Sequence, residues 1–287
     1  MKILVTGSKG QLGRELHNLL EKEKPGITTY VDIDELDITD RSAVESYVKN
    51  GDFTHIVNCA AYTAVDRAEE EKLECAAVNI DGIANLGRIS GEMGIKIIHI
   101  STDYVFDGKA YKPYTESDKV NPTSQYGSTK RKGETSLLGL APDAVIVRTG
   151  WLYSPYGNNF VKKILQLSKS QPTLRVVNDQ IGTPTYAADL ARAIYTIISS
   201  KQWYPGIIHF SNEGVCSWYD LAVAIQRISG IISCPVQPIS TADYPTLAER
   251  PYYSVLDKSK FKKTFSVTIP HWEESLTKCI ERINEGN

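Results

Sequence analysis

The chain of 287 residues has only five cysteines, and no two of them form a Cys-x-x-Cys pair. An odd number of scattered cysteines argues against a disulfide framework and against a cysteine-based zinc site. The sequence therefore favours a reduced, intracellular setting for the protein.

The sequence also lacks a long hydrophobic run. No segment reaches the roughly 20 apolar residues that a membrane-spanning helix needs. Met1 and Lys2 lead directly into an apolar stretch, without the charged, apolar and small-residue regions of a secretory leader. We expect a cytoplasmic protein that makes no membrane contact.

An excess of charge of either sign is missing as well. The 32 Lys and Arg nearly balance the 34 Asp and Glu, so the net charge is −2. Such a balance gives no general attraction to nucleic acid or to an anionic membrane surface. Any phosphate-bearing ligand must therefore be held by local groups.

The N-terminus combines an apolar run, residues 2–6, with Gly7, Gly10 and Gly13 and then leucines at helical spacing. A glycine turn between a strand and a helix lets a pyrophosphate approach the free N–H groups of the helix. The spacing is Gly-x-x-Gly-x-x-Gly rather than the common Gly-x-Gly-x-x-Gly. It predicts a dinucleotide site, with a plain strand-to-helix turn as the alternative.

An acidic residue, Asp32, follows the second expected strand, residues 27–31. At this distance from the glycine turn, a carboxylate typically binds a ribose hydroxyl and favours NAD over NADP. Lys9, in the turn, could instead receive a 2′-phosphate, and Asp32 could be a solvated loop residue. Both NADH and NADPH therefore stay open. Asp37 and Ile38 are candidates for contact with the adenine end.

Further apolar runs alternate with helical patterns up to about residue 150. This alternation predicts an α/β fold with a doubly wound parallel sheet of the Rossmann type. We predict a dinucleotide-binding domain over residues 1–150 and a smaller C-terminal substrate-binding lobe over most of 151–287. Part of the region 160–215 is expected to return to the sheet. The expected elements are strands at 55–59, 96–100, 144–148 and 207–211, helical segments at 66–93, 123–138, 186–200, 217–229 and 271–284, and an irregular stretch at 230–256.

Tyr126 and Lys130 lie one turn apart if a helix begins near residue 123. A nearby positive charge lowers the pKa of a phenol toward the working range. Thr102, at the end of an expected strand, offers a hydroxyl to hold a carbonyl oxygen. The three groups suit reduction of a carbonyl by hydride. Because 16 Tyr and 21 Lys supply about one such spacing by chance, a surface pair is the alternative.

Two other polar features are expected to have no catalytic role. His99 lies inside an apolar strand, which favours a packed core residue. The acidic run 69–71 is interpreted as a solvated first turn, favoured by the helix dipole.

Taken together, these motifs resemble the extended short-chain dehydrogenase/reductase superfamily, and within it the family of dTDP-4-dehydrorhamnose reductases. The narrower resemblance rests on five separated segments in the same order: residues 10–13, 58–69, 101–106, 148–153 and 179–185.

The resemblance implies that the C4 ketone of dTDP-4-dehydro-L-rhamnose is reduced by NADPH or NADH. This is the last step in making dTDP-L-rhamnose for cell-surface polysaccharide. It assigns catalysis to Thr102, Tyr126 and Lys130. The implied cofactor contacts are Gly7, Gly10, Gln11, Leu12, Gly13, Asp37, Ile38, Ala61, Tyr62, Thr63, Tyr126 and Lys130.

Thr102, Asp103 and Trp151 match sugar-binding positions of the family, and Arg250 matches a phosphate-binding arginine. The ring of Trp151 suits the apolar face of a deoxysugar. A homodimer is also implied.

Some family members bind Mg²⁺ at the dimer interface. Glu15 and Asp189 are the nearest matches here, but no clear ligand set is present, so we assign no metal.

Other functions remain as alternatives. A non-catalytic NAD(P)-binding subunit on the same fold would be expected to lose part of the triad, which this chain keeps. A nucleotide-sugar dehydratase has a second acid after the threonine, where this chain has Asp103 and Tyr104. Another nucleotide-sugar reductase or an epimerase also stays open.

Overall fold

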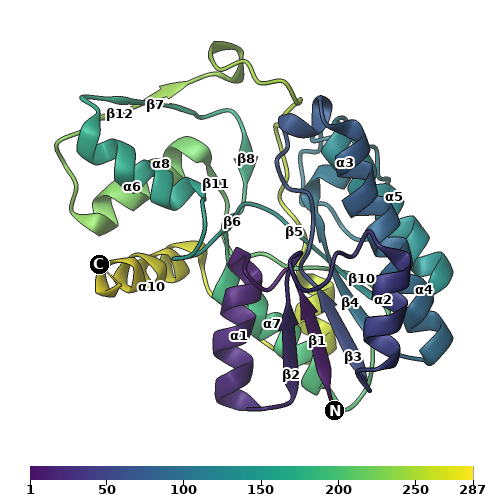
Figure 1. Ribbon diagram of the computed structural model, residues 1–287. Helices are drawn as coiled ribbons and strands as arrows, with labels where there is room; N and C mark the ends of the chain where they lie inside the picture. The colour runs from purple at the N-terminus through teal and green to yellow at the C-terminus, as the bar shows by residue number, and fades with distance from the viewer. Residues whose placement is uncertain (287) are drawn as a thin grey trace.

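The computed structural model describes residues 1–286 of the chain. Its centre is a six-stranded sheet in which every pairing is parallel, in the order β10-β5-β4-β3-β1-β2 (Figure 1). The predicted α/β class and parallel sheet are confirmed. The strands are β1 (Ile3–Thr6), β2 (Thr28–Val31), β3 (His55–Asn58), β4 (Lys96–Thr102), β5 (Val145–Thr149) and β10 (Gly206–His209).

Helices cover both faces of the sheet, as Figure 1 shows. Successive side chains of a strand point to opposite faces, so Val5 joins one apolar cluster and Leu4 the other. Strands buried on both faces are continuous apolar runs, which is why they are visible in the sequence. One face is covered by α1 (Gln11–Glu23) and α7 (Ala187–Ser199), the other by α2 (Arg41–Lys49), α4 (Ile83–Met93) and α5 (Gln125–Leu140).

The strand order reverses direction beside β1, which pairs with β2 on one side and β3 on the other. Open α/β sheets bind ligands at such a point, outside the carboxyl ends of the strands. Gly7 follows β1 with a φ of +67°, and a Cβ there would lie 2.6 Å from the nitrogen of Ala60 after β3. Glycine is therefore required where these two strand ends meet.

A smaller C-terminal lobe stands beside the carboxyl edge of the sheet (Figure 1). It has its own apolar core, formed by α6 (Phe160–Ser170), α8 (Trp218–Ser229) and α10 (Trp272–Glu285) with the parallel pair β7 (Leu174–Val177) and β12 (Val236–Ile239). Short pairs lead into the lobe: β6 (Leu152–Tyr153) with β9 (Thr185–Tyr186), and β8 (Ile181–Gly182) with β11 (Cys216–Ser217).

Some elements differ from the sequence-based expectation. The stretch 230–256 contains β12, because its backbone pairs with β7 from a distant part of the chain. A further helix, α9 (Ser259–Phe265), packs on the sheet through Phe261. The segment 66–93 is helical but broken, with α3 (Lys72–Ala76) and a π-helical turn over Ala77–Gly82 before α4. The division into domains at residue 150 stays a prediction.

Within residues 1–286, we find no helix that is both long enough and apolar enough to span a membrane.

Candidate active site

A cleft of about 890 Å³ opens along the carboxyl edge of the sheet. The ends of β1, β3, β4 and β5 contribute to its wall, together with the start of α5 and Trp218 of the C-terminal lobe. Of the predicted site residues, Arg250 does not line it. Those that do are Gly7, Gly10, Gln11, Leu12, Gly13, Asp32, Asp37, Ile38, Ala61, Tyr62, Thr63, Thr102, Asp103, Tyr126, Lys130 and Trp151.

The glycine turn presents backbone donors to this cleft. Helix α1 begins at Gln11, and Gly10 at its N-cap supplies no side-chain acceptor to the first N–H groups. A Cβ at Gly13 would lie 2.4 Å from the carbonyl oxygen of Gly7, so only glycine lets the helix sit this close to the turn. A helix N-terminus with free N–H groups fits the pyrophosphate of a dinucleotide.

Asp32 is held in place at the end of β2. Its carboxylate accepts hydrogen bonds from the backbone N–H groups of Lys9 (2.8 Å) and Ile33 (2.9 Å). The ammonium of Lys9 is bound to Asp34 at 2.6 Å and lies 3.6 Å from Glu35. Lys9, the cation considered for a 2′-phosphate, is therefore already paired with two carboxylates.

The start of α5 is determined by two acceptors. Ser124 caps the helix by accepting from the backbone N–H of Gly127 at 3.2 Å. Glu69 accepts from the N–H of Gln125 at 2.8 Å. These bonds place Tyr126 in the first turn, with an exposed fraction of only 9%.

The expectation that the acidic run 69–71 is merely solvated is therefore wrong for Glu69. It is wrong for Glu71 too, which accepts from the phenol of Tyr62 and pairs with Arg67.

The phenol of Tyr126 lies against Thr102 at the end of β4. Burial raises the pKa of Tyr126 above its ordinary value, and a hydrogen bond with Thr102 offsets only part of that effect. The ring meets Tyr104 edge to face, with centroids 5.6 Å apart. The phenol is thus protonated at neutral pH and can act as a proton donor.

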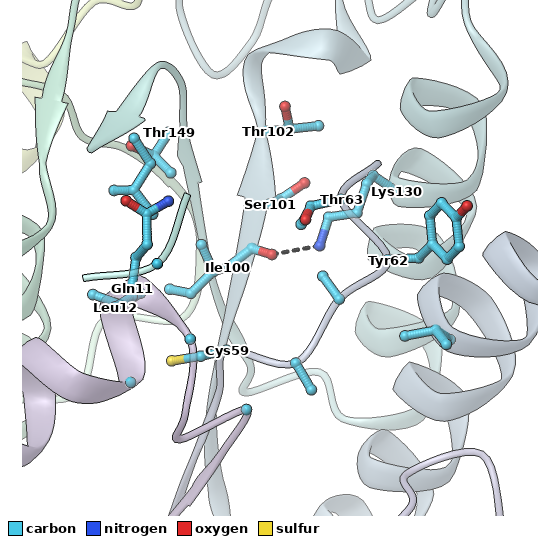
Figure 2. A pocket seen from close by; sticks show the side chains of 18 of the residues that line it. Gln11, Leu12, Cys59, Tyr62, Thr63, Ile100, Ser101, Thr102, Lys130 and Thr149 are labelled. Atoms are coloured by element: carbon cyan, nitrogen blue, oxygen red, sulfur yellow. Dashed lines mark hydrogen bonds between the residues drawn. The ribbon is translucent and has the colours of Figure 1, made fainter. Parts of the chain in front are cut away.

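Lys130 reaches from α5 to the middle of β4, as Figure 2 shows. Its Nζ donates to the carbonyl oxygen of Ile100 at 2.6 Å and lies 3.3 Å from Nε2 of His99. Burial lowers the pKa of Lys130 to about 8. The expected lowering of the Tyr126 pKa by Lys130 is not found in this structure, because the amino group is directed at Ile100 and burial dominates the phenol.

The predicted sugar-binding residues Thr102, Asp103 and Trp151 all line the cleft. Asp103 is 3% exposed, and burial raises the pKa of its carboxyl to about 6. Trp151 stacks on Trp218 of α8, with ring centroids 3.5 Å apart. A Cβ at Gly182 would lie 2.6 Å from the Trp151 ring, so this glycine makes room for the indole. No sequence pattern pointed to Trp218, since only the tertiary fold brings it to the cleft.

Arg250 does not line the cleft but contacts Tyr104, which does. It forms an ion pair with Asp66 and donates to the hydroxyl of Tyr104 at 3.1 Å. Asp66 also accepts from the backbone N–H of Ala248 at 3.1 Å. These contacts hold the segment around Arg250 against the loop that follows β3.

The two candidate metal ligands are engaged by other groups. Glu15 accepts from Arg282 through both oxygens, at 2.8 and 3.0 Å, and Asp189 accepts from Asn212 at 2.7 Å. Among residues 1–286 no three His, Cys, Asp or Glu side chains are grouped so as to hold a metal ion.

Known proteins match this chain over nearly its full length. Residues 1–285 match the family described as the RmlD substrate binding domain. A dTDP-4-dehydrorhamnose reductase of Aggregatibacter actinomycetemcomitans is 41% identical over 285 residues, covering 96% of this chain and 97% of that protein. This chain belongs to the dTDP-4-dehydrorhamnose reductase family.

Solved structures agree with this assignment to the dTDP-4-dehydrorhamnose reductase family. A reductase of the family from Clostridium acetobutylicum superposes with a TM-score of 0.94 at 44% identity, covering 99% of this chain and 100% of that one. One from Bacillus anthracis, solved in complex with NADP, has a TM-score of 0.94 at 38% identity, covering 98% of this chain and 100% of that one. A UDP-glucose 4-epimerase from Thermus thermophilus, at 20% identity, shares the fold alone.

Proposed function

We propose that this protein reduces the C4 ketone of dTDP-4-dehydro-L-rhamnose to dTDP-L-rhamnose, with NADH or NADPH as the electron donor. The observation that carries the proposal is the meeting of Thr102, Tyr126 and Lys130 beside the glycine turn in one cleft. The family relationship supplies the substrate. A cytoplasmic location and use of the product in cell-surface polysaccharide are parts of the same proposal.

The chain offers groups that would hold a dinucleotide. The N–H groups at the start of α1 would hold the pyrophosphate, Asp32 a ribose hydroxyl, and Asp37 with Ile38 the adenine end. Ala61, Tyr62 and Thr63 would form the wall beside it. A reduced nicotinamide bound there supplies hydride to the carbonyl carbon.

The protein's own side chains hold the carbonyl oxygen and supply the proton. Thr102 holds the carbonyl oxygen through its hydroxyl, and the protonated phenol of Tyr126 delivers its proton to that oxygen as negative charge develops. Lys130 lines the same cleft, and its pKa of about 8 lets its amino group change charge close to neutral pH. Asp103 and Trp151 bind the sugar. Arg250, which donates to the hydroxyl of the cleft residue Tyr104, is the candidate for the phosphates.

The direct test is to mix the purified protein with dTDP-4-dehydro-L-rhamnose and each reduced nicotinamide in turn. Loss of nicotinamide absorbance and formation of a C4-reduced nucleotide sugar are expected. If neither cofactor is oxidised, the proposed reaction is rejected.

We predict that the protein prefers NADH and that Asp32→Ser shifts the preference toward NADPH by about tenfold or more. Asp32, Asp34 and Glu35 would repel a 2′-phosphate, and Lys9 is already bound to two of these carboxylates. A like charge within a few ångströms at a protein surface costs on the order of 1 to 4 kcal/mol. Dissociation constants for both reduced cofactors are measured by nicotinamide fluorescence.

The matched control is Asp143→Asn, which removes an exposed carboxylate after α5 that does not line the cleft. It should leave the ratio of the two dissociation constants unchanged. A wild-type preference for NADPH that Asp32→Ser does not alter would contradict the role given to Asp32.

A further inference from the structure

A row of buried polar side chains leads from Lys130 across three strands. Nε2 of His99 lies 3.3 Å from Nζ of Lys130, and Nδ1 of His99 lies 2.9 Å from Nδ2 of Asn58. Oδ1 of Asn58 accepts from the hydroxyl of Thr6 at 2.5 Å. All four residues are at most 1% exposed, and Thr6, Asn58 and His99 are neighbours in the register of β1, β3 and β4. The proposed reaction makes no use of Thr6, Asn58 or His99.

The orientation of the Asn58 amide follows from a fixed donor. The backbone N–H of Ala60 can only donate, and it lies 3.2 Å from Oδ1 of Asn58. Nδ2 of Asn58 faces the carbonyl oxygen of Ala60 at 3.3 Å, which can only accept. The oxygen of the amide therefore faces Thr6 and Ala60, and its NH₂ group faces His99.

The amide in turn determines the tautomer of His99. Because Asn58 donates to Nδ1, this nitrogen carries a lone pair and the ring proton of the neutral imidazole is on Nε2. Burial lowers the pKa of His99 well below its ordinary value, so the ring stays neutral. The Nε2–H then points at the amino group of Lys130. It can donate to a neutral amine but cannot accept a hydrogen bond from an ammonium.

The other groups around Lys130 do not cancel the effect of the His99 contact on the charge of the lysine. On α5, Glu134 favours the ammonium, but it is bound to Arg148, Arg131 and Ser101. Tyr126 is a protonated phenol, and the thiols of Cys59 and Cys75 face the lysine from the loop after β3 and from α3. Burial raises the pKa of Cys59 to about 12, which keeps that thiol neutral.

We infer that Asn58 and His99 are positioning residues that control the charge of Lys130. Asn58 holds the imidazole in the tautomer whose Nε2–H faces the amino group, and this contact favours the neutral amine over the ammonium. Lys130 is thereby poised to change charge close to neutral pH. Such a lysine can release a proton toward the site when the phenol has lost its own, and it regains one from water. This catalytic consequence rests on the proposed function, whereas the tautomer does not.

The decisive experiment records histidine ¹⁵N spectra of the ligand-free protein, in which the nitrogen shifts distinguish the two neutral tautomers. His99 is assigned among the five histidines with His99→Gln. We expect the Nε2–H tautomer in the wild-type protein. An Nδ1–H tautomer would overturn the inference, and this measurement needs no variant that alters the row of polar groups.

Asn58→Asp tests the effect on Lys130 with a side chain of the same shape. The carboxylate still accepts from Thr6 and Ala60, but it accepts from His99 instead of donating to it. The ring proton must move to Nδ1, so that Nε2 becomes an acceptor for the ammonium. We expect the titration midpoint of Lys130, followed by lysine NMR in the ligand-free protein, to rise by at least about one pH unit, a tenfold change in proton affinity.

Thr6→Val is the control, because it removes a donor to Asn58 without reversing the amide and should leave the tautomer as it is. A reversed tautomer in Asn58→Asp with an unchanged Lys130 midpoint would overturn the inference. So would a raised midpoint with an unreversed tautomer, because that rise would come from the added negative charge alone. If the wild-type protein has reductase activity, its pH profile should shift upward in Asn58→Asp by a similar amount. If the protein has no reductase activity but gives the expected NMR results, the proposed function is rejected. The control of the Lys130 charge by Asn58 and His99 is then still supported.

Discussion

Tyr126→Phe is expected to lower turnover by at least about 100-fold, the scale of a lost general acid. The phenylalanine keeps the ring and its edge-to-face contact with Tyr104, so the fold and the cleft should be retained. Only the hydroxyl beside Thr102 is lost, and with it the proton that the reduced oxygen requires. Turnover is measured with both substrates saturating.

Two further measurements make this result specific. The affinity for the reduced nicotinamide, measured by fluorescence titration, should stay close to that of the wild-type protein. Tyr195→Phe, which removes a phenol where α7 packs on the sheet, should have nearly wild-type turnover. Near-normal turnover in Tyr126→Phe would remove Tyr126 from its role as proton donor.

Glu134→Gln is expected to lower the free energy of unfolding by about 3 to 5 kcal/mol, the cost of breaking a buried ion pair. Glu134 and Arg148 are 0% and 1% exposed, and two hydrogen bonds of 2.8 Å join them. The glutamine leaves the Arg148 guanidinium buried without a full counter-charge. Urea unfolding followed by circular dichroism measures the difference.

The control for this prediction is the double substitution Glu134→Leu with Arg148→Met. Because it removes both charges and fills the space with apolar groups, it should be clearly more stable than Glu134→Gln. If the single variant loses less than about 1 kcal/mol, or the double variant is no better, the pair does not have the structural role assigned to it.

The same pair makes stability depend on pH at the acid end. Burial, the largest single effect, raises the pKa of Glu134, but the hydrogen bonds and charge of Arg148, with those of Ser101 and Arg131, together lower it below its ordinary 4.5. A lowered pKa in the folded state means that this stabilisation is fully present above pH 4.5 and is lost as the pH falls through the lowered value.

Much of the fold was predictable because its signals are local. All six strands of the central sheet were predicted from the sequence, the inner ones because a strand buried on both faces is an apolar run. The glycine turn was recognisable because its spacing reflects how closely a helix approaches a strand end. Tyr126 and Lys130 share a helix, so their proximity follows from a spacing of four residues.

The positions of the chemical groups relative to one another were decided by contacts between distant segments. β12 forms a strand because β7 offers it a partner, and Trp218 enters the cleft because α8 packs there. His99 was correctly expected to be buried, but its contact with Lys130 depends on how α5 lies over β4.

The sequence by itself thus determined the parallel sheet, the dinucleotide turn and the identity of the reactive groups, since each depends on residues close together in the chain. Only the tertiary structure decided the charge environment of those groups. It determines which carboxylates pair with Lys9, what buries Tyr126, and which imidazole nitrogen faces Lys130. Burial and hydrogen bonding set a pKa, and both depend on neighbours that no local pattern contains.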